Sequence, residues 1–212
     1  LNLTNSGADG KAISVNGNVT VANSTIVNIT NSGASGKGIK ADSNITFSGG
    51  TTTANLSGAT VLTASGSGNN TSYPSAVKAT GTITVNGGAI TIQGTSAATG
   101  AKGFSSTGAI TINSGNVTIN LAGNGAVYTN TTGVADSYSA AALSSDTNLT
   151  INGGTVATTC SGTGGKGLKS DGTLTVGTST SSPTLNITTT GTRFLVSGSN
   201  YCHPKTLVAV GA

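Results

Sequence analysis

Residues 36–47 form a stretch that recurs in degenerate copies along the whole chain of 212 residues. The stretch reads Gly-Lys-Gly-Ile-Lys-Ala-Asp-Ser-Asn-Ile-Thr-Phe, and the apolar residue at its fourth place has an equivalent in every copy. These anchor residues alternate between short and long spacings of about 26 and about 38 residues: Ile13, Ile39, Val77, Phe104, Leu143, Leu168 and Leu207. Self-similarity of this kind is typical of repeat proteins. We therefore predict a solenoid whose full repeat is a pair of turns.

Each turn contains three short segments in which apolar, polar and apolar residues alternate between Gly, Asn or Asp corners. The first segment carries the anchor. The second reads Val19-Thr20-Val21, Ile45-Thr46-Phe47, Ile83-Thr84-Val85, Ile110-Thr111-Ile112, Leu149-Thr150-Ile151 and Leu174-Thr175-Val176, and the third reads Ile90-Thr91-Ile92, Val117-Thr118-Ile119 and Leu185-Asn186-Ile187. Alternation points two side chains of each segment inward and one outward. No helical pattern lies between the segments, so equivalent segments must pair between turns as parallel strands.

The predicted fold is therefore all-β: a right-handed, single-stranded parallel β-helix of about six to seven turns, with three short strands per turn. We expect residues 1–212 to form one domain without complete end caps. Leu207 should open a seventh turn as its first strand.

Insertions of about twelve residues lengthen every second turn, always after the third segment. Each insertion ends with a tyrosine: Tyr73, Tyr138 and Tyr201. Because the insertions share one corner of the coil, we expect them to form a ridge along one edge, with these tyrosines about two rungs apart.

Composition limits the partners that the chain can have. The formal net charge is +4 and only 7% of the residues are charged. This balance permits an anionic partner but supplies too few basic residues for a nucleic-acid-binding protein. No apolar run approaches the length of a membrane span. The Thr- and Asn-rich composition is typical of a secreted or cell-surface protein, and we predict an extracellular location.

All eight lysines fall at two places relative to the anchors. Five precede an anchor by two residues, and three follow one directly: Lys11, Lys37, Lys102, Lys166 and Lys205, then Lys40, Lys78 and Lys169. In a β-helix they would line one face and its corner. We predict carbohydrate binding by Lys37, Lys40, Lys78, Lys102, Lys166 and Lys169, with Tyr73, Tyr138 and Tyr201 offering ring faces to sugars. The alternative is that lysine and aspartate ladders only keep the rod soluble, and that the tyrosines only pack the insertions.

Three aspartates follow anchors by three residues: Asp42, Asp146 and Asp171. With backbone carbonyls at the corner they are candidate ligands for Ca²⁺, although one carboxylate per rung supplies few of the oxygen ligands that Ca²⁺ needs. No other cofactor is required by the sequence. Five acids spread over the rod, a single histidine and a single arginine do not supply the close carboxylate pair of a glycosidase, so we do not expect an enzyme.

Cys160 and Cys202 are the two cysteines of the chain. In the repeat alignment Cys160 ends a third segment, and Cys202 lies in the insertion of the next turn. A disulfide between neighbouring turns is compatible with this placement, and two reduced thiols are the alternative.

The sequence resembles a family of secreted bacterial carbohydrate-binding β-helix proteins. The resemblance is carried by residues 36–50, by residues 165–176, and by Tyr201-Cys202-His203-Pro204-Lys205 with the following Leu207-Val208-Ala209. It implies a right-handed parallel β-helix, distantly like pectate lyases but without catalysis. It also implies binding of cellulose or acidic polysaccharide and a possible Ca²⁺ site. The scarcity of acids and the degenerate copies at Ser75-Ala76-Val77 and Ala141-Ala142-Leu143 depart from the family pattern.

From the sequence we expect an extracellular carbohydrate-binding protein that recognises cellulose or acidic polysaccharide through the lysine face. The alternative is a structural subunit of an extracellular fibre or surface assembly, in which β-helices stack end to end. A further alternative is that the outward threonines of the second segments form a flat array for ice or a crystalline polysaccharide.

Overall fold

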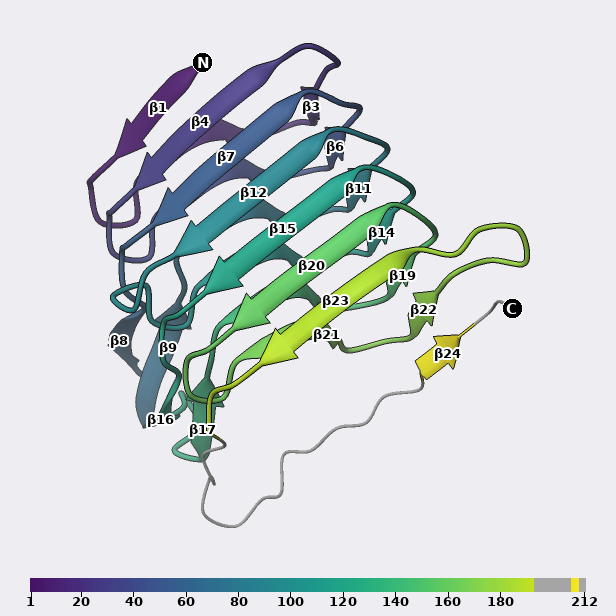
Figure 1. The fold of residues 1–212 in the computed structure, drawn as a ribbon. Helices are drawn as coiled ribbons and strands as arrows, with labels where there is room; N and C mark the ends of the chain where they lie inside the picture. The colour runs from purple at the N-terminus through teal and green to yellow at the C-terminus, as the bar shows by residue number, and fades with distance from the viewer. Residues whose placement is uncertain (193–206, 210–212) are drawn as a thin grey trace.

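The computed structural model describes residues 1–192 and the backbone of residues 207–209. This part of the chain contains strands and no helix. The strands wind into a parallel β-helix with three strands per turn, and the coil in Figure 1 is right-handed, as the sequence predicted. No helix of the described residues is long and apolar enough to cross a membrane.

Three parallel sheets form the walls of the coil. The anchor sheet takes one strand from each turn, in the order β2 (Lys11–Val15), β5 (Lys37–Ala41), β10 (Ser75–Ala79), β13 (Lys102–Ser106), β18 (Ala141–Ser145) and β21 (Lys166–Ser170). The short sheet holds β3 (Val19–Val21), β6 (Ile45–Phe47), β11 (Ile83–Val85), β14 (Ile110–Ile112), β19 (Leu149–Ile151), β22 (Leu174–Val176) and β24 (Leu207–Ala209). The long sheet holds β1 (Asn2–Asn5), β4 (Ile26–Asn31), β7 (Thr51–Leu56), β12 (Ala89–Gly94), β15 (Asn116–Leu121), β20 (Thr155–Cys160) and β23 (Thr184–Thr189).

The core is a set of apolar columns that run along the axis, because equivalent residues of successive turns are paired in register. Ile39 pairs with Val77 and Val77 with Phe104 in the anchor sheet. The rings of Phe47 and Phe104 stack across the interior, with centroids 5.7 Å apart and ring planes 2° from parallel. Apolar burial of this kind is the main driving force for stacking the turns.

The residue before each anchor also points inward, and there only glycine and alanine occur. They alternate from turn to turn: Ala12, Gly38, Ala76, Gly103, Ala142 and Gly167. A Cβ atom on Gly103 would lie 2.5 Å from the carbonyl oxygen of Ala142 and 2.8 Å from Cγ2 of Ile119. Because this small residue and the anchor both face the core, the residues on either side of the pair both face outward. Lysines at these two places therefore share one outer surface.

The position of Leu207 corrects the sequence prediction. The expected first strand of a seventh turn is instead a strand of the short sheet, where Leu207 pairs with Leu174. The residue before Leu207 is Thr206. Threonine is larger than the glycine or alanine that precedes the anchor in each of the six strands of the anchor sheet, and a larger side chain is disfavoured at such an inward place.

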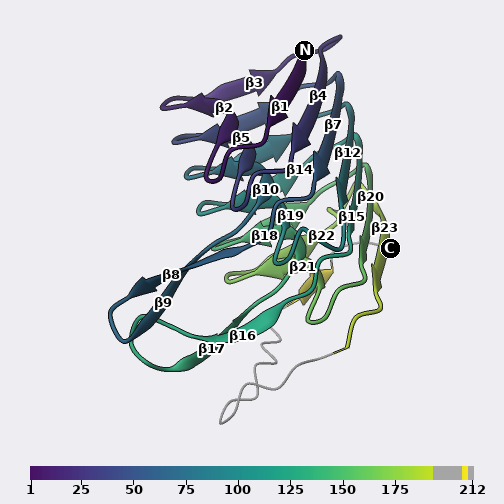
Figure 2. The same cartoon turned by 90° about the vertical axis from the view of Figure 1, so that its left-hand side faces the viewer.

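The first two insertions are antiparallel hairpins. One consists of β8 (Val61–Ser65) and β9 (Gly68–Ser72), the other of β16 (Ala126–Thr129) and β17 (Ala135–Tyr138). An isolated parallel bridge joins Asn69 to Asn130, so the hairpins lie side by side and project together from one edge of the rod (Figure 2). The expected ridge is thus present for these two insertions. The third insertion lies outside the described residues.

Candidate functional site

A pocket of about 260 Å³ lies between the outer surface of the anchor sheet and the base of the hairpins. We call it the lysine pocket. Its walls are formed by Tyr73, Lys78, Lys102, Ser105, Ser137, Tyr138, Ser139, Ser144, Asp146, Lys166 and Lys169. Four of the six predicted lysines and two of the three predicted tyrosines therefore meet at one place. The pairing of strands explains this meeting, since Lys78, Ser105, Ser144 and Lys169 occupy one register column.

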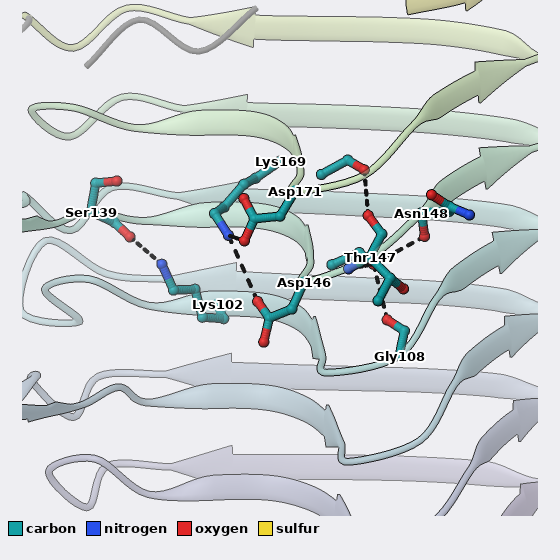
Figure 3. A network of polar contacts seen from close by, with 10 residues as sticks. Lys102, Gly108, Ser139, Asp146, Thr147, Asn148, Lys169 and Asp171 are labelled. Atoms are coloured by element: carbon teal, nitrogen blue, oxygen red, sulfur yellow. Dashed lines mark hydrogen bonds and ion pairs between the residues drawn. The ribbon is translucent and has the colours of Figure 1, made fainter. Parts of the chain in front are cut away.

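Lys102 is the central cation of the pocket. Its Nζ donates a hydrogen bond of 2.6 Å to the carbonyl oxygen of Ser139 (Figure 3) and lies 4.7 Å from the centroid of the Tyr73 ring. Burial, together with the charges of Lys166 and Lys169, lowers the pKa of Lys102 to about 7. Lys102 is thus held by neutral partners that compensate only part of its lost hydration.

Two further lysines approach the pocket from β21. The Nζ of Lys166 donates a hydrogen bond of 2.6 Å to the hydroxyl oxygen of Ser139. Burial, together with the charge of Lys169, lowers the pKa of Lys166. The Nζ of Lys169 lies 2.8 Å from Oδ2 of Asp171 and 3.7 Å from Oδ1 of Asp146 (Figure 3). Only Lys169 among the four pocket lysines forms an ion pair within residues 1–192.

Ser139 is a pocket residue that the sequence did not reveal. It follows β17 directly and positions Lys102 with its carbonyl oxygen and Lys166 with its hydroxyl. In strand register its equivalent after the first hairpin is Tyr73, whose carbonyl oxygen accepts from the Nζ of Lys37 in the same way. The hydroxyl that contacts Lys166 has no counterpart at Tyr73, so no repeated pattern in the sequence points to it.

Lys37 and Lys40, the other predicted binding lysines, lie outside the pocket. The Nζ of Lys37 is buried and donates to the carbonyl oxygens of Ser35, at 2.5 Å, and of Tyr73. Burial lowers the pKa of Lys37 to about 8, with a further contribution from the charge of Lys78. Lys40 forms an ion pair with Asp42.

The tyrosines of the two hairpins form a cluster. The ring centroids of Tyr73 and Tyr138 are 6.4 Å apart, closer than the predicted two rungs, and those of Tyr128 and Tyr138 are 6.3 Å apart. The Tyr138 ring packs over Gly100, where an added Cβ atom would lie 2.8 Å from the ring. These tyrosines thus fix the hairpins to the rod and also wall the pocket. Tyr128 was missed by the sequence analysis, and Tyr201 lies outside the described residues.

The three candidate calcium ligands lie against lysines. Asp42 contacts Lys40, and both Asp146 and Asp171 contact Lys169. Residues 1–192 contain no group of three or more acidic, histidine or cysteine side chains that could hold a metal ion. An ammonium group beside each carboxylate does not fit a Ca²⁺ site, which needs several oxygen ligands without a competing cation.

Cys160 is buried in the core at the end of β20 and forms no disulfide with another described residue. Its Sγ donates to the carbonyl oxygen of Lys166 at 3.1 Å, and burial raises the pKa of the thiol. Cys202 lies outside the described residues, and the disulfide stays a prediction.

Comparisons of the chain with protein-family models, with curated proteins and with solved structures find no match. The resemblance to a family of carbohydrate-binding β-helix proteins therefore stays a prediction, and the lysine pocket is the feature of the molecule that bears on function.

Proposed function

We propose that the chain binds an acidic polysaccharide through the lysine pocket. One observation carries the proposal: four lysines and a single aspartate line the same pocket beside two tyrosine rings. Three of these lysines have no carboxylate partner among residues 1–192. A carboxylate or sulfate group would supply the missing negative charge.

The electrostatics of the pocket favour an anion over a neutral sugar. Ammonium groups that face one another across a partly dehydrated space repel, and each lowers the pKa of the next, as at Lys102 and Lys166. An anionic group placed among them is attracted by all of them at once. With an effective dielectric constant near 20, one such charge pair at 4 Å is worth about 4 kcal/mol before desolvation is subtracted.

The surroundings of the pocket favour a sugar chain over a small anion. Tyr73 and Tyr138 line the pocket with aromatic rings, and Ser105, Ser137 and Ser144 line it with hydroxyl-bearing side chains that can bond sugar hydroxyls. Lys40 pairs in register with Lys78, one strand spacing of about 4.8 Å away. A polymer with repeated charges can therefore continue from the pocket along the anchor sheet.

The proposal is for binding without hydrolysis. Glycoside hydrolysis needs two carboxyl groups, one as acid and one as base or nucleophile. The two acids nearest the pocket, Asp146 and Asp171, both contact the same Lys169 ammonium. This arrangement suits charge balance at a binding surface.

Affinity electrophoresis in gels with and without polygalacturonate tests the proposal. We expect retardation of the unaltered chain that falls with added salt, and loss of most of it in the double variant Lys78→Ala, Lys166→Ala. The matched control is Lys11→Ala, because Lys11 is an exposed lysine outside the pocket whose Nζ donates to the carbonyl oxygen of Asp9. Equal retardation of the double variant and the control would overturn the proposal. Salt-independent retention on insoluble cellulose would instead place binding on a different face.

A further inference from the structure

We propose that Lys102 captures an anionic aldehyde or α-keto acid in the lysine pocket as a covalent imine. The inference uses the pocket of the proposed function, but it does not require that a polysaccharide is the ligand. The chemical class of the ligand follows from two features of the pocket: a nucleophilic amine inside a cavity, and further cations around that amine.

The first feature is the position of the Lys102 amine. Its Nζ is fixed within a pocket of about 260 Å³ by the Ser139 carbonyl and the Tyr73 ring. Neither contact is an ion pair, so neither holds the amine in its charged form as a carboxylate would. A cavity of this size admits a small ligand or the end of a larger one.

Burial and the charged groups that face Lys102 determine its protonation. Lys166 and Lys169 on β21 oppose its charge, whereas Asp146 beyond β18 and Cys160 on β20 favour it more weakly. Lys78, Tyr73 and Tyr138 complete the pocket. Burial and the two lysines dominate, and the pKa of Lys102 falls to about 7. At neutral pH the neutral, nucleophilic amine is therefore far more populated at Lys102 than at an exposed lysine.

The second feature is the selection of an anion. Lys78, Lys166 and Lys169 remain as cations around the cavity, with Asp146 as the one carboxylate of its wall. A carboxylate or phosphate on the ligand would lie among these ammonium groups and bring its carbonyl carbon to Lys102. A neutral aldehyde lacks this attraction.

The reaction is a balanced condensation. The lone pair of the neutral Lys102 amine attacks the carbonyl carbon, and the π electrons of the carbonyl move to its oxygen, which takes a proton. The resulting carbinolamine loses that oxygen as water when a second proton reaches it, and the C=N bond forms. The amine gives up its two hydrogens, so one water is released and no oxidant or reductant is needed. The Lys166 ammonium, which also contacts Ser139, is one proton donor of the pocket wall.

Lys37 gives an internal comparison. Burial lowers its pKa to about 8, but its Nζ is buried against two carbonyl oxygens outside the pocket. If low basicity alone decided reactivity, Lys37 and Lys102 would react alike. If the pocket decides, Lys102 reacts and Lys37 does not.

Borohydride trapping with glyoxylate, followed by peptide mapping of the reduced adduct, tests the inference. At pH 7 we expect Lys102 to carry at least about tenfold more label than any exposed lysine, because an ordinary lysine is almost fully protonated there. Acetaldehyde at the same concentration should show much weaker preference. Lys102→Arg should lose the selective label, and Lys11→Arg should retain it.

Label spread evenly over the lysines, or concentrated on Lys37, would overturn the inference. Equal selectivity for acetaldehyde would overturn the claim that the ligand is anionic. The two proposals can be rejected separately. Retardation by polygalacturonate without a Lys102 adduct would contradict only the proposal of imine formation. An adduct without retardation would contradict only the proposal of polysaccharide binding.

Discussion

The Nζ of Lys102 lies 4.7 Å from the centroid of the Tyr73 ring, although the two residues belong to different turns and Tyr73 ends a hairpin. A cation over an aromatic face is stabilised by about 0.5–2 kcal/mol, depending on its hydration. The contact thus ties the first hairpin to the anchor sheet. It also leaves Lys102 without a negative partner, which makes its charge costly in the folded state.

This cost predicts a dependence of stability on pH. The pKa of Lys102 in the folded chain, about 7, lies below that of an unfolded lysine, about 10.4. Between these values the unfolded chain binds the additional proton, so the free energy of unfolding rises with pH, and the penalty is fully present below pH 7. Relative to Lys102→Met, the unaltered chain should gain about 2 kcal/mol between pH 6 and pH 9.

Urea unfolding of both proteins at each pH measures this gain. The difference between the two removes the contribution of Lys37 and of every other group that both contain. A constant difference across the range would contradict the prediction.

The alternation of alanine and glycine before the anchors predicts unequal tolerance of the two residues. Gly103→Ala places a Cβ atom 2.5 Å from the Ala142 carbonyl oxygen and should cost about 1–3 kcal/mol in the free energy of unfolding. The reverse change one turn later, Ala142→Gly, creates no clash and should cost only about 0.5–1 kcal/mol. Denaturant melts of the two variants check the order of these costs. A neutral or stabilising Gly103→Ala would show that the turns can move apart freely.

The repeated part of the structure was predictable because its signal is local and is copied in every turn. The segment Ile45–Phe47 and its equivalents coincide with the strands of the short sheet. The same regularity predicted that lysines gather on one face. The error at Leu207 arose because apolar alternation fits the first and the second segment equally well. Only the small residue before an anchor separates them, and Thr206 breaks that rule.

The unrepeated part could not be predicted in the same way. The two contacts of Ser139 with lysines depend on how the second hairpin folds back onto the anchor sheet. No periodic pattern encodes that path. The low pKa of Lys102 likewise depends on burial by a hairpin from another turn. The sequence therefore predicted which residue types meet but not which of them share a pocket.

The stacked rings of Phe47 and Phe104 stabilise the middle of the rod, so we expect removal of one ring to weaken the rod there. Both side chains are fully buried, and Phe104→Ala should lower the free energy of unfolding by about 3–5 kcal/mol. Because the two ends of a solenoid are coupled mainly through contacts between neighbouring turns, the loss of a contact in the middle should uncouple them. Hydrogen exchange should then become faster on both sides of β13. Phe104→Leu, which keeps most of the volume, is the control and should exchange nearly as the unaltered chain does.

The Tyr138 ring has two roles that can be separated by mutation. It contacts Tyr73 and Tyr128 and packs over Gly100, and it also forms a wall of the lysine pocket. Tyr138→Ala should free the second hairpin, so that amide exchange in residues 126–138 becomes faster and retardation by polygalacturonate weakens. The three-stranded turns do not depend on this ring, and an aromatic pair contributes only about 0.5–1.5 kcal/mol beyond its buried area. The free energy of unfolding should therefore fall by roughly 1–3 kcal/mol.

Tyr128→Phe is the matched control for Tyr138→Ala. It keeps the ring that contacts Tyr138 and removes only the hydroxyl that donates to Oδ2 of Asp136 at 3.1 Å. Tyr128 does not line the pocket. Retardation should therefore stay unchanged in Tyr128→Phe and drop in Tyr138→Ala. If Tyr138→Ala frees the hairpin and still binds polygalacturonate as strongly as the unaltered chain, the hairpin is not part of the binding site, and the lysines of the anchor sheet bind the polymer by charge alone.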